Sequence, residues 1–218
     1  MNIESQLAWG KTKSTCSEPL IFTDTVDFST FTPVFLDADG VLWEDNGPGS
    51  IFNTGTSKSF MSNILLIKEK VPNSLVVIIS NQTCIARGIC DEHTLRKKIT
   101  EMCTPTKATL PPIIFSYCPH HPNADVSAYR QDCWCRKPSF GQFDKLKNIL
   151  DLNMRNAFMI GDRITDLEAA EKAGIKQKYL IASKKSFEIN ESDGPDAWSS
   201  SIVFQVNKDI KSILLSRV

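Results

Sequence analysis

From Pro33 onward, apolar stretches of strand length alternate with patterns typical of amphipathic helices, and this alternation constrains the fold more than any other feature of the chain. The strand-like stretches are residues 33–36, 75–79, 112–115 and 157–160. Between them, apolar residues recur at the spacing of one helix face. Strands that alternate with helices predict an α/β domain with a doubly wound, mostly parallel sheet. Two more short strands near residues 179–182 and 202–206, and a last helix ending near Leu215, complete the expected domain.

The chain has 218 residues, which suits one domain with at most a small appendage. We assign the domain to residues 33–218 and residues 1–32, which lack a periodic pattern, to an N-terminal extension of unassigned role. The formal net charge of +0 gives no basic stripe for nucleic acid, so we expect no nucleic-acid partner. No apolar run could span a bilayer and no signal peptide is visible, so the expected location is the cytoplasm, away from membranes.

Each of the first four expected strands is followed by side chains that can react or bind a ligand. Asp37 follows the first strand, Ser80 and Asn81 follow the second, a segment rich in cysteine and histidine follows the third, and Asp162 follows the fourth. In doubly wound sheets, ligands bind outside the carboxyl ends of the strands. The sequence therefore predicts that these four segments meet at one site.

Two acidic pairs lie among these segments. Asp37 and Asp39 stand two residues apart at a strand end, so both carboxylates can reach the same cleft. Asp162 precedes a predicted helix whose first turn contains Asp166, and the simplest interpretation of Asp166 is a favourable interaction with the helix N-terminus. Residues 165–168, with Thr and Glu at the two ends, have the spacing of a capping box.

A loop after the third strand holds cysteine and histidine in pairs. Cys118 is followed two residues later by His120, and Cys133 is followed two residues later by Cys135, with His121 as a competing imidazole. Two pairs of such ligands suit tetrahedral zinc, and a closed set of four leaves no open position for water. We therefore predict a structural Zn²⁺ site, with thiols kept reduced for the metal instead of paired in disulfides.

Four ordered motifs resemble those of the haloacid dehalogenase (HAD) superfamily. They are Val34-Phe35-Leu36-Asp37-Ala38-Asp39-Gly40, Ile79-Ser80-Asn81-Gln82, Arg136-Lys137-Pro138 and Ile160-Gly161-Asp162-Arg163-Ile164-Thr165-Asp166. The resemblance extends over residues 33–210 and implies a phosphatase of the HAD-like fold. Only a short segment separates the first two motifs, so we expect no large cap domain there.

By position, the resemblance implies a role for each matching residue. Asp37 would be the nucleophile that takes the phosphoryl group, and Asp39 would be the general acid and base. Mg²⁺ would bind Asp37, the backbone carbonyl of Asp39 and Asp162, with Asp166 supporting that shell. The residues implied to bind the phosphoryl group or substrate are Ser80, Asn81 and Lys137.

Within the superfamily, the zinc loop is similar to that of the D-glycero-D-manno-heptose-1,7-bisphosphate phosphatases. The matching stretch covers residues 117–138, and Ile85-Ala86-Arg87-Gly88 adds to the match. This similarity favours His120 over His121 as the zinc ligand. Histidinol-phosphate phosphatases share the zinc ligands but have a shorter intervening loop.

The expected activity is hydrolysis of a small sugar phosphate, with a heptose bisphosphate or a related sugar as substrate. Arg87 and Arg136 are candidates to bind a second phosphate or the sugar, although Arg87 is equally typical of a solvated surface arginine. The chain departs from the heptose pattern at Ala38, at Ser80 and over residues 41–53. The alternatives are a histidinol-phosphate phosphatase and a zinc-stabilised interaction domain without catalysis. We expect a monomer or a small homo-oligomer.

Overall fold

The computed structural model describes residues 17–23, 27–104, 112–182 and 204–216. Its strands are β1 (Leu20–Phe22), β2 (Thr32–Leu36), β3 (Ser74–Asn81), β4 (Ile113–Cys118), β5 (Phe158–Gly161), β6 (Gln177–Ile181) and β7 (Gln205–Asn207). Its α-helices are α2 (Thr56–Lys70), α3 (Thr83–Ala86), α4 (Glu92–Cys103), α5 (Gly141–Leu150), α6 (Ile164–Lys172) and α7 (Ile210–Leu215). Two short 3-10 helices are η1 (Ser50–Phe52) and η3 (Ser127–Tyr129).

The strands form one sheet in the order β1-β4-β3-β2-β5-β6-β7. All neighbouring pairs are parallel except β1 and β4, which are antiparallel. The chain builds outward from β2 to β3 and β4 on one side, and then returns to place β5 on the other side of β2. This doubly wound arrangement confirms the predicted fold class, and the crevice beside β2 is where such sheets bind ligands.

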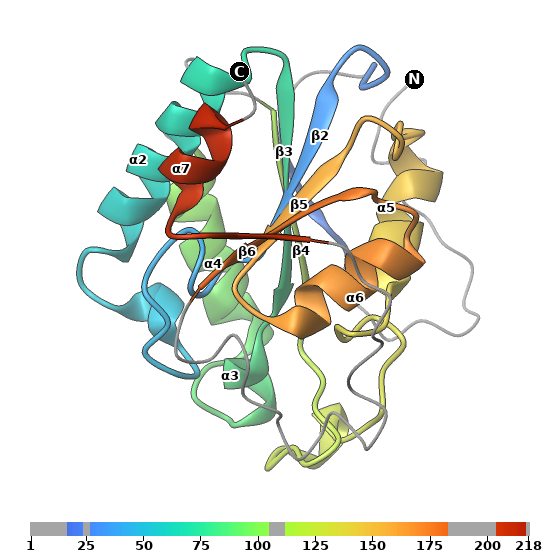
Figure 1. Ribbon diagram of the computed structural model, residues 1–218. Coiled ribbons are helices and arrows are strands. Elements are labelled where there is room, and N and C mark those ends of the chain that lie inside the picture. The colour runs from blue at the N-terminus through green and yellow to red at the C-terminus, as the bar shows by residue number, and fades with distance from the viewer. Residues whose placement is uncertain (1–16, 24–26, 105–111, 183–203, 217–218) are drawn as a thin grey trace.

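Helices cover both faces of the sheet, so the strands are apolar on both sides. Figure 1 shows α2, α4 and α7 against one face and α5 and α6 against the other. Successive side chains of β3 alternate between the two layers, with Val76 and Ile78 in one apolar cluster and Val77 and Ile79 in the other. The continuous apolar run in the sequence is therefore the pattern of a parallel strand buried on both faces.

The start of α6 differs from the prediction. The expected capping box over residues 165–168 does not form, because the helix already begins at Ile164 with Arg163 as its N-cap. Instead, the Asp166 carboxylate accepts a hydrogen bond from the backbone N–H of Arg163 at 3.1 Å. Asp166 thus contacts the start of the helix, as the sequence suggested, although the N-cap lies two residues earlier than in the expected box.

Part of the predicted N-terminal extension adds to the sheet. β1 runs antiparallel to β4, with Leu20 opposite Phe115. Glu18, just before β1, forms an ion pair of 3.0 Å with Lys145 of α5. At the other edge, the last strand is β7, whereas the first two residues of the expected strand at 202–206 lie outside the described residues.

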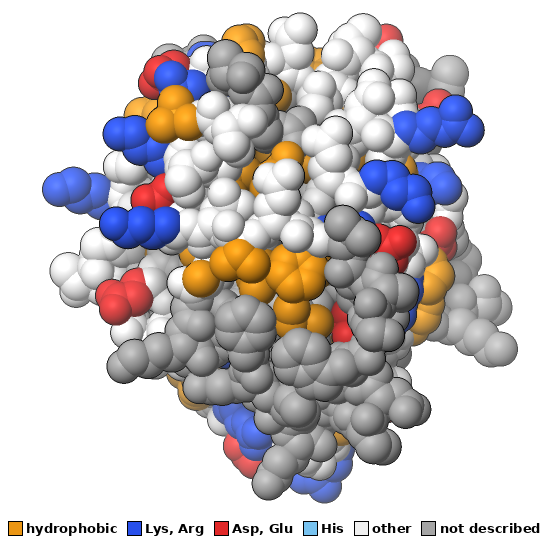
Figure 2. Space-filling model, viewed as in Figure 1, with side chains coloured by type: hydrophobic (Ala, Val, Ile, Leu, Met, Phe, Trp, Pro, Cys, Tyr) orange, Lys and Arg blue, Asp and Glu red, His pale blue; other side chains and the backbone are white. Residues whose placement is uncertain are grey.

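Between β2 and β3, the fully described stretch 37–73 contains η1 and α2 and no inserted domain. The carboxyl ends of the strands therefore open toward loops, as the spacing of the motifs predicted. On the face shown in Figure 2, basic and acidic side chains are interspersed around the rim without forming a basic stripe among the described residues. Within the described ranges, no helix has the length and apolar character needed to cross a membrane.

Candidate active site

Three of the predicted site residues meet because their strands are neighbours. Asp37 follows the central strand β2, Ser80 lies in β3, and Asp162 directly follows β5. β2 pairs in parallel with both β3 and β5, so the three carboxyl ends lie side by side. The backbone N–H of Asp37 also donates to the Ile160 carbonyl at 3.0 Å, which extends the β2–β5 pairing to the site itself.

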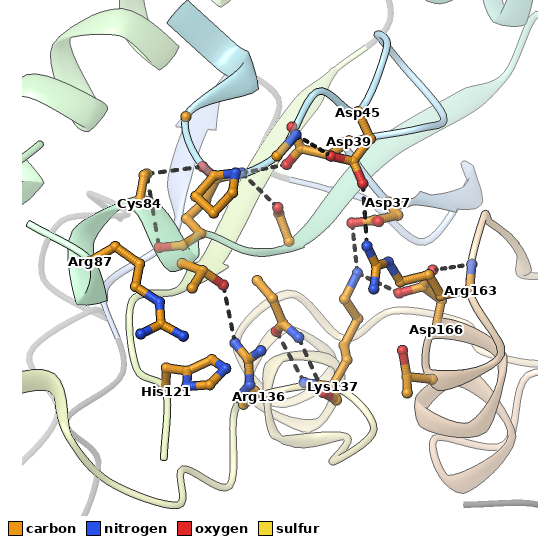
Figure 3. Close-up of a pocket in the computed structure, with 18 of the residues that line it drawn as sticks. Asp37, Asp39, Asp45, Cys84, Arg87, His121, Arg136, Lys137, Arg163 and Asp166 are labelled. Carbon is orange, nitrogen blue, oxygen red and sulfur yellow. Dashed lines mark hydrogen bonds and ion pairs between the residues drawn. The ribbon is translucent and has the colours of Figure 1, made fainter. Parts of the chain in front are cut away.

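Lys137 is the cation at the centre of this site. Its buried Nζ donates to Asp37 Oδ1 at 2.6 Å and to the Ile79 carbonyl at 2.7 Å, and it lies 2.7 Å from Asp166 Oδ1. The Asn81 side chain holds the lysine backbone through two hydrogen bonds of 3.1 Å, one to the N–H and one to the carbonyl. Figure 3 shows the lysine side chain extended toward both carboxylates. Asn81 therefore positions the lysine that contacts Asp37.

The three acidic residues form a buried cluster around that lysine. Asp37, Asp162 and Asp166 each offer an oxygen, and these oxygens all lie within 4.8 Å of one another. Burial, and then the charge of Asp166, raise the pKa of Asp37 to about 7 even though Lys137 opposes the shift. Burial and the charge of Asp37 raise the pKa of Asp162 to about 8. Three carboxylates and one ammonium leave the cluster negative when ionised, which favours a further cation.

The carboxylate of Asp162 supplies the clearest test of whether such a cation fits. The residue is 1% exposed, and neither of its oxygens has a hydrogen-bond partner among the described residues. A buried carboxylate without partners is costly, and a divalent cation would satisfy it. Oxygen ligands are those that Mg²⁺ prefers. The residues present thus fit a magnesium ion held by Asp37 and Asp162.

Asp39 stands on the turn that follows β2. Gly40 after it has a φ of 83°, a left-handed conformation that side chains other than glycine rarely adopt. One Asp39 oxygen accepts from Trp43 Nε1 at 2.7 Å, and the other accepts from Gln82 Nε2 at 3.2 Å. Burial raises the pKa of Asp39, which favours its protonated form more than in water.

The site opens into a cleft of about 610 Å³. In Figure 3, Arg87, His121 and Arg136 gather at one end of it, away from the acidic cluster. Near Asp37, Asp45 and Arg163 face each other across the cleft in an ion pair of 3.3 Å. The cleft thus has an acidic reaction centre and, separately, a basic end.

The backbone and neighbouring side chains hold the basic end in place. Arg87 donates to the Asn123 carbonyl at 2.8 Å and pairs with Asp125 at 3.2 Å. Arg136 donates to the His120 carbonyl at 3.1 Å. Arg87 lines the cleft and its side chain is partly exposed, so a substrate in the cleft could reach it.

The predicted zinc ligands are close together in the loop after β4. Cys118, His120 and Cys133 are buried, and one ligand atom from each lies within 4.8 Å of the other two, whereas His121 lines the cleft instead. A hydrogen bond from Cys118 lowers the pKa of Cys133 to about 5, so this pair supplies a thiolate suited to a metal. Cys135 is buried beside these thiols, but its sulfur is in a disulfide bond, which differs from the expected reduced ligand.

Sequence reasoning missed four residues of the site: Trp43, Asp45, Gln82 and Arg163. Trp43 and Asp45 lie between two motifs, and Gln82 and Arg163 lie inside motifs, yet none was assigned a role. The side chains of Trp43 and Asp45 reach the site because of the turn after β2, and that of Arg163 because of the early start of α6. The spacing of residues along the chain carries no signal for either feature.

Comparison with known proteins identifies the family. The D-glycero-β-D-manno-heptose-1,7-bisphosphate 7-phosphatase of Photorhabdus laumondii is 34% identical over 156 residues, which are 70% of this chain and 81% of that protein. The chain belongs to the HAD-like phosphatases. A phosphatase of the same name from Escherichia coli K12 is 31% identical over 157 residues, covering 70% of this chain and 80% of that protein. A family profile described as HAD-hydrolase-like matches residues 134–186 of this HAD-like phosphatase.

Two crystal structures support the same fold for this HAD-like phosphatase. A putative HAD-like phosphatase from Mesorhizobium loti has a TM-score of 0.63 at 20% identity and covers 88% of each chain. The D,D-heptose 1,7-bisphosphate phosphatase from B. bronchiseptica, complexed with magnesium and phosphate, has a TM-score of 0.60 at 22% identity. That match covers 86% of this chain and 98% of the other. These structures confirm the predicted fold, and the relatives of 34% and 31% identity confirm the predicted family and phosphatase class.

Proposed function

We propose that this HAD-like phosphatase hydrolyses a small sugar phosphate, with a D-glycero-D-manno-heptose bisphosphate as its substrate, through an aspartyl-phosphate formed on Asp37. One observation carries the mechanism: Lys137 contacts Asp37 inside a buried cluster that Asp162 and Asp166 complete. The name shared by the similar relatives supports the choice of sugar.

In the first step, a carboxylate oxygen of Asp37 attacks phosphorus while the bond from phosphorus to the sugar oxygen breaks. Asp39 gives its proton to that leaving oxygen, so the sugar departs as an alcohol. In the second step, Asp39 takes a proton from water as the water oxygen attacks phosphorus and the bond from phosphorus to the Asp37 oxygen breaks. The products are inorganic phosphate and the free Asp37 carboxylate, and Asp39 again carries its proton.

The main obstacle is repulsion between the Asp37 carboxylate and a phosphate dianion. Lys137 offsets part of this repulsion, and its contact with Asp37 also keeps the nucleophile oriented. Mg²⁺ bound to Asp37, Asp162 and the Asp39 carbonyl would neutralise charge on the phosphoryl oxygens. The buried Ser80 hydroxyl, held by Gln82 at 2.8 Å, lies at the end of β3 where a phosphoryl oxygen would bind.

The basic end of the cleft suits a substrate with a second negative group. Arg87 and Arg136 would bind the second phosphate of a bisphosphate, because guanidinium groups match phosphate oxygens in geometry and charge. His121 lines the same end, and its Nδ1 accepts from the Asn123 N–H at 3.0 Å, so the neighbouring backbone holds the ring at this end of the cleft.

The zinc loop would fix the position of this end. Arg136 and Lys137 directly follow Cys135 in the chain, so a metal at Cys118, His120 and Cys133 would anchor the segment that supplies both cations. Gln142 of α5 already ties the loop to the site, because its amide donates to the Cys135 carbonyl at 2.9 Å and to the Ser80 carbonyl at 3.3 Å. Zinc binding, a cytoplasmic location and a monomeric or small oligomeric state stay predictions.

The test is phosphate release with Mg²⁺ over a panel containing both heptose bisphosphate anomers, monophosphorylated sugars and histidinol phosphate. We expect strong preference for one bisphosphate anomer and no turnover by Asp37→Asn. Arg87→Gln should raise KM for the bisphosphate and leave the monophosphates unaffected. Preference for histidinol phosphate would reject the sugar assignment, and robust turnover by Asp37→Asn would reject the covalent mechanism.

A further inference from the structure

A buried tryptophan contacts the residue that acts as general acid and base in the proposed function. Trp43 is 4% exposed, and its Nε1 donates to Asp39 Oδ1 at 2.7 Å. The Trp43 carbonyl also accepts from the Gly40 N–H at 2.8 Å, so this residue closes the turn that carries Asp39. Both its backbone and its side chain therefore constrain the same carboxylate.

Helix α2 fixes the indole in turn. The Trp43 ring packs against Phe60, with 6.4 Å between the ring centroids and an angle of 52° between the planes. One turn further along α2, Asn63 donates to the Leu42 carbonyl at 3.0 Å. The indole is therefore held by packing against α2, with its N–H directed at Asp39.

The two oxygens of Asp39 have different partners. Oδ1 faces the indole, which can only donate a hydrogen bond. Oδ2 accepts a hydrogen bond from Gln82 Nε2 at the longer distance of 3.2 Å. Donors therefore hold the Asp39 carboxyl group at both oxygens, and the shorter contact is the one with the indole.

We propose that Trp43 is a positioning residue for proton transfer: by holding Oδ1 of Asp39, it fixes the orientation in which this carboxyl group gives a proton to the leaving oxygen and takes one from water. This inference rests on the proposed function. As the Asp37–phosphorus bond forms and the ester bond breaks, the proton of Asp39 moves to the leaving oxygen. Asp39 then takes a proton from the water that attacks phosphorus, as the bond between Asp37 and phosphorus breaks.

Two leaving groups distinguish this role from simple packing. An alkyl phosphate needs a proton on its leaving oxygen, whereas p-nitrophenolate is stable enough to leave with little protonation. Loss of one hydrogen bond to a charged group predicts that Trp43→Phe lowers kcat for a sugar phosphate by about tenfold or more, at nearly constant KM. Single-turnover release of p-nitrophenolate from p-nitrophenyl phosphate, which reports the first step alone, should fall no more than about twofold.

Phe60→Leu is the matched control, because it loosens the same packing without removing the indole N–H. It should slow both substrates to the same small extent. Parallel losses for both leaving groups in Trp43→Phe would overturn the positioning role while leaving the phosphatase assignment intact. A wild-type protein that hydrolyses neither ester in Mg²⁺ would instead reject the proposed function.

A spectroscopic measurement tests the contact without any turnover. In ¹⁵N-tryptophan-labelled protein, the indole signal that disappears in Trp43→Phe belongs to Trp43, one of four tryptophans. We expect Asp39→Asn to shift that signal, because the acceptor of the indole hydrogen bond changes, and Glu44→Gln, which changes an exposed neighbouring carboxylate, to leave it in place. An indole signal that does not respond to Asp39→Asn would overturn the proposal.

Discussion

Replacing Lys137 with methionine tests how the acidic cluster is held together. The side chain of Lys137 is 2% exposed, and its ammonium contacts Asp37 at 2.6 Å and Asp166 at 2.7 Å. Lys137→Met keeps most of the side-chain volume but removes the ammonium group that contacts these carboxylates. The variant should therefore be destabilised most strongly where no metal can take over the role of the ammonium.

The expected magnitude follows from the geometry. Removing one partner of a buried ion pair costs about 3–5 kcal/mol, because the remaining charge is left buried and uncompensated. Protonation relieves part of this cost, since the pKa of Asp37 is already raised to about 7 and loses the opposing effect of the lysine. At pH 7.5 without metal, we expect a loss of about 3 kcal/mol in the free energy of unfolding.

Mg²⁺ should restore much of the stability that Lys137→Met loses. A ligand that binds only the folded state at one hundred times its Kd contributes about 2.7 kcal/mol. Urea unfolding of wild type and Lys137→Met, each in EDTA and in saturating Mg²⁺, measures this difference directly. Turnover should not recover, because removing a charge-stabilising donor from a reaction centre lowers kcat by about 10² to 10³.

Lys178→Met provides the control. Lys178 is also buried and pairs with Glu171, but it lies on β6 away from the cleft lining. This variant should lose stability equally with and without Mg²⁺ and keep its turnover. Equal stability of Lys137→Met and wild type in EDTA, or normal turnover by Lys137→Met, would refute the reasoning about the cluster.

Three further predictions concern metals and backbone geometry. The folded pKa values of Asp37 and Asp162, about 7 and about 8, exceed the ordinary value of 3.8, so the metal-free folded state binds protons more tightly than the unfolded state. The stability of the metal-free protein should therefore fall as pH rises from about 4 to 8. Over the same range its affinity for Mg²⁺, measured by calorimetry, should rise, and a pH-independent affinity would contradict this prediction. Gly40→Ala should lower the free energy of unfolding by about 1–2 kcal/mol and reduce turnover, because φ of Gly40 is 83° and the new Cβ would meet the Asp162 carboxylate. An unchanged urea midpoint and an unchanged kcat would refute this prediction. Cys118→Ser should lower the zinc content of purified protein, measured by mass spectrometry, and equal zinc in wild type and variant would remove Cys118 from the site.

The strand-end rule explains why much of this site could be predicted. Asp37, Ser80 and Asp162 each follow or end an apolar run, and parallel strands bring such positions to one edge of the sheet. This outcome requires only the correct strands and their direction. Lys137 is different, because it lies in a loop, and only the resemblance to a known motif pointed to it.

Contacts that depend on turn geometry were not predictable in the same way. The Trp43 contact with Asp39 requires the left-handed conformation at Gly40 and the packing of the ring against α2. β1 was missed because its three residues are too few to show a periodic pattern, and it is fixed by pairing with a strand more than ninety residues away. In both cases, long-range packing selects one of several local conformations that the sequence permits.

The contrast between residues placed by strands and residues placed by loops also separates the reaction centre of this enzyme from its substrate specificity. Asp37 and Asp162 are fixed by hydrogen-bonded strands, so their geometry follows from the sheet. The basic end of the cleft comes from loop residues such as Arg87 and Arg136, which are held by the Asn123 and His120 carbonyls. A loop can change length or sequence without disturbing the sheet, and substrate preference can therefore diverge while the reaction centre stays the same. Experiments that aim to change the substrate should accordingly target these loops.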